Sequence, residues 1–124
     1  ALALADEFWP GPLTLIVKAA NNVPQAFRAV DDTIALRMPD DAVALALIEK
    51  VGFPLATSSA NFQGEPPART FDELNPELLA KVPAALGDGS PRSGISSTVV
   101  DCTGDAPRVI RVGAITPDDI ARFA

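Results

Sequence analysis

Strand-like and helix-like segments alternate along this chain, and that alternation is the feature that most constrains its fold. Helical patterns cover residues 1–9, a segment capped by Asp40 and Asp41 that ends near Val51, residues 70–81 and the chain from Thr116 onward. Strand patterns cover residues 12–19, 32–38, 53–56, a short stretch after 84, 96–102 and 107–113. Since several of these strands are apolar on both faces, we expect an α/β (α+β) fold with a twisted, mostly mixed β-sheet flanked by helices.

Local signals place the boundaries of these elements. Gly52 follows the second helical segment and is expected to end it. Residues 70–73 read as a capping box for the third helix, which the pair Asn75–Pro76 would perturb. Residues 103–106 suit a hairpin turn between the last two strands, and Thr116 followed by Pro117 suits the start of the last helix. The length of 124 residues predicts a single domain.

The absence of histidine and the presence of one cysteine exclude whole classes of chemistry within this chain. A Ser-His-Asp or Cys-His mechanism needs a histidine, and a zinc site of the usual kind needs more cysteines or histidines. A net charge of −6 is a poor match for a domain that grips nucleic acid through its phosphates. No apolar run approaches the roughly 20 residues that span a bilayer, so we expect no membrane partner and a cytoplasmic location.

Arg37 is the first candidate site residue, because it emerges from an apolar strand. Alternation places Thr33, Ala35 and Arg37 on one face and Ile34, Leu36 and Met38 on the other. A guanidinium in such a place needs an anionic partner. That partner is either a ligand or one of the many aspartates in an internal ion pair, and the residue pattern favours the ion pair.

The segment "GFPLATSSANFQGEPPA", residues 52–68, is the second candidate. Its predicted strand runs into neutral hydroxyls and an amide, with Leu55, Thr57 and Ser59 expected on one face. Polar groups after a strand end suit a ligand, since open α/β sheets bind at strand ends. A turn in which Ser and Asn satisfy backbone groups is an equally good interpretation.

Two weaker candidates follow. The segment "GDGSPRSGISST", residues 87–98, could form an anion-binding nest of backbone amides, although a plain loop is the simpler interpretation. Arg111 lies in the strand-like "VIRVG" and either faces a ligand or is a solvated edge residue. Together these residues describe a pocket of hydroxyls, glycines and two arginines that suits a negatively charged ligand.

The order and spacing of several motifs resemble the YrdC-like family of threonylcarbamoyl-AMP synthases. These motifs, which cover essentially the whole chain, are "FWPGPLTLIV", "IALRMP", "PLATSSANFQGEP", "SGISSTVVD" and "RVIRVGAIT". The resemblance implies a YrdC/DHBP-synthase-like fold for residues 1–124, with the N-terminal segment of the family domain missing. That segment carries a basic motif for the triphosphate, so we expect this fragment alone to be inactive or severely impaired.

The resemblance also implies roles for individual residues. Members of the family combine L-threonine, bicarbonate and ATP to give threonylcarbamoyl-AMP and pyrophosphate. By motif position the threonine-binding residues would be Arg37, which would hold the carboxylate, Thr57 and Ser97. The ATP-binding residues would be Thr33, Ser59, Asn61, which would shape the turn, Arg111 and, through its backbone only, Pro67, where the family often has a hydroxyl.

The same resemblance implies the cofactor and the partners. Mg²⁺ would arrive with ATP, and we expect no metal held by the protein itself. A tRNA-modifying transferase complex would use the product to modify the adenosine beside the anticodon. Two alternatives remain at this point: a YrdC-like domain of a hydrogenase-maturation carbamoyltransferase, and a non-catalytic RNA-binding module, which the acidic composition disfavours.

Overall fold

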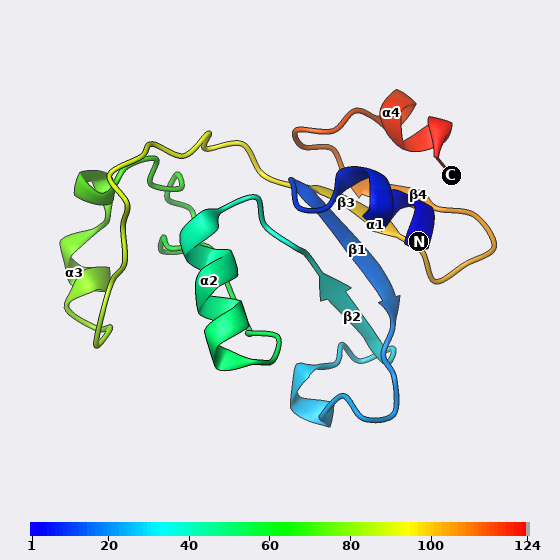
Figure 1. Ribbon diagram of the computed structural model, residues 1–124, viewed down its shortest axis with the longest axis horizontal. Helices are drawn as coiled ribbons and strands as arrows, with labels where there is room; N and C mark the ends of the chain where they lie inside the picture. Colours follow the sequence, from blue (N-terminus) through cyan, green and yellow to red (C-terminus); the bar gives the residue numbers. More distant parts are fainter. Residues whose placement is uncertain (124) are drawn as a thin grey trace. The chain divides into compact units, whose positions relative to one another are not determined.

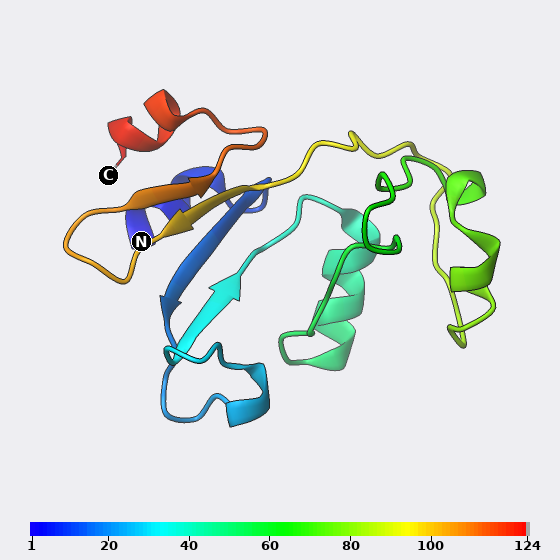
Figure 2. The same ribbon diagram turned by 180° about the vertical axis from the view of Figure 1, so that it is seen from behind.

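The computed structural model describes residues 1–123, which divide into two compact units. One unit comprises residues 1–41 and the chain from Ile95 onward, and we call it the sheet unit. The other comprises Ala42–Gly94, and we call it the insert unit. Figures 1 and 2 show the elements of each unit from opposite sides.

The sheet unit contains one four-stranded sheet, which is mixed as the sequence predicts, although only four of the six predicted strands form it. Its elements are α1 (Leu2–Phe8), β1 (Leu13–Lys18), η1 (Gln25–Phe27), β2 (Thr33–Leu36), β3 (Thr98–Asp101), β4 (Arg108–Arg111) and α4 (Pro117–Arg122). The strand order is β2-β1-β3-β4, with β1 and β3 parallel and the two outer strands antiparallel to their neighbours. Consequently β1 and β3 begin at the sheet end where β2 and β4 finish.

The core of the sheet unit lies on one face of the sheet. Leu13 and Leu15 of β1 and Val100 of β3 alternate with more exposed residues, and they meet Leu4 of α1 and Ile120 of α4. Phe8 and Phe123 stack edge to face with ring centroids 5.5 Å apart, which joins the two helices. Figures 1 and 2 agree that α1 lies on one side of the sheet. Within this unit the other face of β1 and β3 therefore carries no helix.

Capping and turn residues shape the sheet unit, and the start of α4 is as predicted. Thr116 and Asp119 form a reciprocal capping box at the start of α4, with Pro117 in its first turn. The guanidinium of Arg28 donates hydrogen bonds to the carbonyls of Ala20, Asn21 and Val23, which closes the turn between β1 and β2.

The insert unit contains α2 (Ala42–Val51), η2 (Phe71–Glu73) and α3 (Pro76–Leu79) joined by irregular segments. The helix α2 ends as predicted at Gly52, whose φ of 81° lies in the left-handed region and whose amide donates to Ile48. The predicted strand over 53–56 is wrong, because no strand occurs in the insert unit of the described chain. Pro54 lacks an N–H for a ladder, and Phe53 is exposed rather than buried by a neighbouring strand.

The predicted single helix over 70–81 and the short strand after 84 are also wrong. Thr70 makes no side-chain cap, and the carboxylate of Glu73 accepts a hydrogen bond from the amide of Arg69 instead. Pro76 holds Asn75 in an extended conformation, so the segment splits into η2 and α3, and Asn75 caps α3.

Asp101 gives the sheet unit an acid-sensitive contact. The hydroxyl and the amide of Thr103 donate to its carboxylate at 2.6 and 2.9 Å, and Arg108 adds a hydrogen bond at 3.1 Å. These contacts lower the pKa of Asp101 to about 2 from 3.8. Because the folded-state pKa is the lower one, the carboxylate stabilises the fold fully above about pH 4 and loses this effect as the pH falls toward 2.

We therefore expect Asp101→Asn to flatten the pH dependence of stability between pH 4 and pH 2. Urea unfolding followed by circular dichroism at several pH values measures this dependence. The wild type should lose more stability than Asp101→Asn across that interval, whereas equal slopes would contradict the assignment.

Candidate functional site

Two arginines lie at the same end of the sheet unit. Arg37 directly follows β2 and Arg111 is the last residue of β4, and both strands finish at the end where β1 and β3 begin. The strand order separates them by three strand spacings, or about 14 Å of backbone. The two arginines that the sequence predicts as candidate site residues therefore lie at the same end of one sheet.

Hydrogen bonds to neutral groups hold both guanidiniums. The Nε of Arg37 donates to the carbonyl of Gly11 at 3.1 Å. The Nε and Nη2 of Arg111 donate to the carbonyl of Ser97 at 3.2 and 3.0 Å, and Nη2 also donates to the Ser97 hydroxyl at 3.2 Å. These contacts orient each side chain without neutralising its charge.

No carboxylate among residues 1–123 lies within ion-pair distance of Arg37 or Arg111. The acids that do pair with arginines lie elsewhere, for example Asp101 with Arg108 and Asp32 with Arg28. The internal ion pair that the residue pattern favoured for Arg37 is therefore wrong. Both arginines are exposed, so each is free to receive an anion from solution.

Two hydroxyls lie between the arginines. The Oγ1 of Thr14 in β1 and the Oγ of Ser97, just before β3, are 2.8 Å apart. Continuing the β1–β2 register by one residue places Thr14 opposite Arg37, while Ser97 contacts Arg111. Arg37, Thr14, Ser97 and Arg111 thus form a row across four neighbouring segments of the sheet, on the face opposite α1, and we call it the hydroxyl–arginine row.

Buried contacts behind the row fix its register. Thr98 is fully buried, and its hydroxyl donates to the carbonyl of Ile115 at 2.6 Å and accepts from the amides of Gly113 and Ile115 at 3.0 Å each. A Cβ at Gly113 would collide with the Ser96 carbonyl oxygen and lie 2.5 Å from the carbonyl carbon of Ser97. The chain after Arg111 can therefore pass close behind Ser97 only because residue 113 is glycine.

Thr33 lies away from the row. It is the first residue of β2, opposite Lys18, whereas Arg37 follows the last residue of the same strand. The Thr33 hydroxyl donates to the Asp31 carboxylate at 2.7 Å, and the residue is buried. The structure therefore does not bring Thr33 together with Arg37, Ser97 and Arg111, and its contact with ATP stays a prediction.

The remaining predicted residues belong to the insert unit. Thr57, Ser59 and Pro67 are exposed and lie outside helices and strands. The side-chain amide of Asn61 donates to the carbonyls of Phe62 and Glu65 at 3.0 Å each, and so closes the turn at Gly64. The predicted alternation of Leu55, Thr57 and Ser59 on a strand face is wrong, because this segment is not a strand.

The glycine-rich loop offers little to an anion. Within residues 87–94, the carboxylate of Asp88 accepts hydrogen bonds from the amide of Ser90 at 2.9 Å and from Arg92 at 3.1 Å. These bonds lower the pKa of Asp88, with the Ser90 amide as the largest cause. The Asp88 carboxylate thus already accepts from one of the backbone amides that an anion-binding loop would use.

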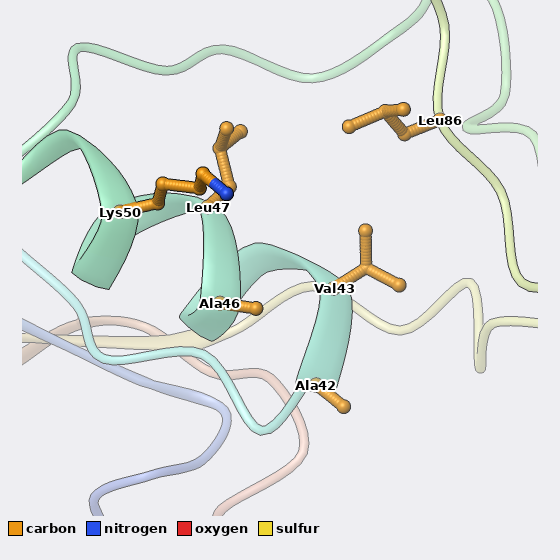
Figure 3. Close-up of a pocket in the computed structure, with 6 residues that line it drawn as sticks. All are labelled: Ala42, Val43, Ala46, Leu47, Lys50 and Leu86. Atoms are coloured by element: carbon orange, nitrogen blue, oxygen red, sulfur yellow. The ribbon is translucent and has the colours of Figure 1, made fainter.

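A pocket in the insert unit is apolar and includes no predicted site residue. Its lining consists of Ala42, Val43, Ala46, Leu47 and Lys50 of α2 with Leu86, which lies across from the helix in Figure 3. No group of three or more His, Cys, Asp or Glu side chains in the described part of the chain could hold a metal ion. The hydroxyl–arginine row is therefore the better candidate for polar chemistry.

A comparison with protein families identifies the family of the chain. The family model for Sua5, YciO and YrdC proteins, described as "Telomere recombination", matches residues 1–113.

The chain belongs to the Sua5/YciO/YrdC family.

Relatives in this family are similar over nearly the whole chain. A threonylcarbamoyl-AMP synthase of Pyrococcus abyssi is 36% identical over 96% of this chain, and one of Bacillus subtilis is 38% identical over 97%. A protein of Mycobacterium tuberculosis named putative threonylcarbamoyl-AMP synthase is 38% identical over 98%. The chain spans 35% of the length of the first two relatives and 55% of the third.

Solved structures in the Sua5/YciO/YrdC family share the fold. Sua5 of P. abyssi in complex with L-threonine has a TM-score of 0.87 and 36% identity, covering 97% of this chain and 35% of that one. E. coli YciO has a TM-score of 0.75 and 25% identity, covering 96% and 58%. These matches confirm the predicted family and the predicted mixed sheet with helices. None of the helices that the structure describes is long and apolar enough to cross a membrane.

Proposed function

We propose that the protein to which this chain belongs is an L-threonylcarbamoyladenylate synthase. It would make threonylcarbamoyl-AMP and pyrophosphate from L-threonine, bicarbonate and ATP. The observation that carries this proposal is the 36–38% identity, over 96–98% of the chain, to proteins named threonylcarbamoyl-AMP synthase. The structure of Sua5 with L-threonine, which superposes on 97% of the chain, supports threonine as one substrate.

The hydroxyl–arginine row supplies the chemistry that the threonine site needs. We assign the threonine carboxylate to Arg37, whose guanidinium is exposed and has no carboxylate partner within residues 1–123. A planar guanidinium matches a carboxylate with two parallel hydrogen bonds, and this pairing is among the stronger polar contacts in proteins. Ser97 and, from the insert unit, Thr57 would complete the site through their hydroxyls.

We assign ATP to Arg111, Thr33, Ser59 and Asn61, with a backbone contact at Pro67. The Arg111 charge remains available for a phosphate, since its hydrogen bonds go only to Ser97. Mg²⁺ would enter as part of the MgATP substrate, held by the phosphates. The described residues offer no cluster of acidic side chains for a resident ion.

The proposed reaction depends on alignment more than on proton transfer. The threonine amine and bicarbonate give N-carboxythreonine and water. An oxygen of this carbamate then attacks the α-phosphorus of ATP, and the bond to the bridging oxygen breaks so that pyrophosphate leaves. Positioning of two bound reactants can lower such a barrier by about 7–11 kcal/mol, and fixed cations stabilise the charge that develops on phosphate. A chain without histidine can supply both effects.

The cellular setting is part of the same proposal. A threonylcarbamoyl adenylate is an activated acyl group, so a transferase must pass it to its acceptor. We expect a tRNA-modifying transferase complex to do so in the cytoplasm.

The test is product formation by the full-length protein. Incubation with L-threonine, bicarbonate and MgATP should release pyrophosphate only when all three are present, and mass spectrometry should detect threonylcarbamoyl-AMP. Product formation from carbamoyl phosphate without threonine, or none from the three substrates, would contradict the proposal.

Ser59→Ala is expected to raise the KM for ATP by about tenfold while changing the KM for threonine less than twofold. Loss of one hydrogen bond to a charged phosphate accounts for such a change. Ser58→Ala, at the neighbouring exposed hydroxyl, is the matched control and should behave like the wild type. Equal effects of the two variants would remove Ser59 from the ATP site.

A further inference from the structure

Thr14 occupies the centre of the hydroxyl–arginine row, although the sequence pattern gives it no role. It follows Leu13 in β1 and faces away from the core, because Leu13 and Leu15 on either side are buried. Its hydroxyl is 2.8 Å from that of Ser97 across the parallel β1–β3 pair. On the other side, the β1–β2 register continued by one residue places it beside Arg37.

We infer that Thr14 is a positioning residue of the threonine site, whose hydroxyl fixes the orientation of the Ser97 hydroxyl beside the substrate. The inference rests on the proposed function and extends it to a residue outside the predicted site. Residues opposite each other in an antiparallel pair have Cβ atoms about 5 Å apart, so the pair of hydroxyls lies beside the base of the side chain that we assign to the substrate carboxylate.

The Ser97 hydroxyl needs a second hydrogen-bond partner besides Arg111. The Ser97 Oγ already accepts a hydrogen bond from the Nη2 of Arg111. Its own proton and its remaining lone pair are shared between Thr14 and any bound ligand. The two hydroxyls carry one proton each, and one of these protons lies in the hydrogen bond between them. The pair therefore presents a single O–H donor outward, which a carboxylate oxygen can accept.

Removal of the Thr14 hydroxyl would leave the Ser97 hydroxyl with Arg111 as its one remaining partner within residues 1–123 and would leave the arginine in place. Arg111 keeps two hydrogen bonds to the Ser97 backbone carbonyl, at 3.2 and 3.0 Å, which do not depend on the Ser97 side chain. Ser97 itself is only 6% exposed, so its backbone stays fixed. We therefore expect the variant to have a higher KM for threonine and an unchanged KM for ATP.

The test compares Thr14→Val, which keeps the shape but loses the hydroxyl, with Thr14→Ser, which keeps the hydroxyl, in the full-length protein. Thr14→Val should raise the KM for L-threonine about fivefold to tenfold and change the KM for ATP less than twofold. Thr14→Ser should restore the KM for threonine to within about twofold of the wild type, as expected when a hydrogen bond rather than packing is lost.

Thr103→Val is the matched control. It removes a hydroxyl that donates to Asp101 at the other end of β3, and it should leave both KM values unchanged. An unchanged threonine KM in Thr14→Val would overturn the inference, as would equal rises in both KM values or a Thr14→Ser variant as impaired as Thr14→Val. A wild-type protein that makes no threonylcarbamoyl-AMP would instead reject the proposed function, and this inference with it.

Discussion

Arg37→Ala should weaken L-threonine binding by about 10-fold to 100-fold in the full-length protein. A hydrogen bond to a charged group contributes about 1.5–3 kcal/mol, and each 1.4 kcal/mol corresponds to a factor of ten. Arg37 is exposed, and its removal takes away a single hydrogen bond, the one from its Nε to the carbonyl of the buried residue Gly11. We therefore expect a loss of stability of about 1 kcal/mol beside the larger loss of threonine binding. Isothermal titration with threonine measures it.

Two further variants sharpen this prediction. Arg37→Lys keeps the charge but loses the planar fork, so its affinity for threonine should fall between the wild type and Arg37→Ala. Arg108→Ala removes an exposed arginine at the start of β4, which pairs with Asp101 away from the hydroxyl–arginine row, and it should bind threonine normally. Equal losses in Arg37→Ala and Arg108→Ala would point to a general effect of charge and contradict the assignment.

Thr98→Val should destabilise the fold by about 3 kcal/mol. The valine matches the shape of threonine but cannot bond, so the amides of Gly113 and Ile115 and the carbonyl of Ile115 lose their partner behind the sheet. Each unsatisfied buried polar group costs about 1–3 kcal/mol, and partial relaxation of the segment after β4 reduces the sum. Thermal or urea unfolding measures the change.

Thr98→Ser is the control for this second prediction. It keeps the hydroxyl and loses one methyl group, so it should cost about 1 kcal/mol, close to the value for one buried carbon. A Thr98→Val variant as stable as Thr98→Ser would show that the three hydrogen bonds contribute little. Because Thr98 adjoins Ser97, the destabilised variant should also bind threonine less well, whereas Arg37→Ala should lose binding with a smaller loss of stability, that of its hydrogen bond to Gly11.

The four strands of the sheet could be predicted from the sequence because each carries its own local signal. The alternation of Leu13 and Leu15 with Thr14 indicates a strand with one buried face. The turn after Cys102 indicates a hairpin. Residues 53–56 carry a similar apolar signal yet form no strand, because a strand also needs a neighbour to pair with and N–H groups to pair through. Neither requirement can be read from a short apolar run.

The candidate site could be predicted only in part. Arg37, Ser97 and Arg111 were found by their place in strands and by the resemblance, and the structure brings them to one end of the sheet. Thr14 was missed, since one hydroxyl on the outer face of a strand is an ordinary surface residue until the register is known. That register joins β1 to β3 across more than 80 residues of sequence, which no local pattern encodes. The aspartate partner favoured for Arg37 was wrong for the same reason: composition shows that acids exist, not where they lie.

Arg37 is the residue that anchors the threonine carboxylate in the proposed site. The measurement that tests this most directly is a crystal structure of the full-length protein with L-threonine and a non-hydrolysable ATP analogue. We predict that both carboxylate oxygens of threonine lie about 2.7–3.2 Å from guanidinium nitrogens of Arg37, beside the hydroxyls of Thr14 and Ser97. Threonine bound elsewhere, with the Arg37 guanidinium facing solvent, would contradict the account.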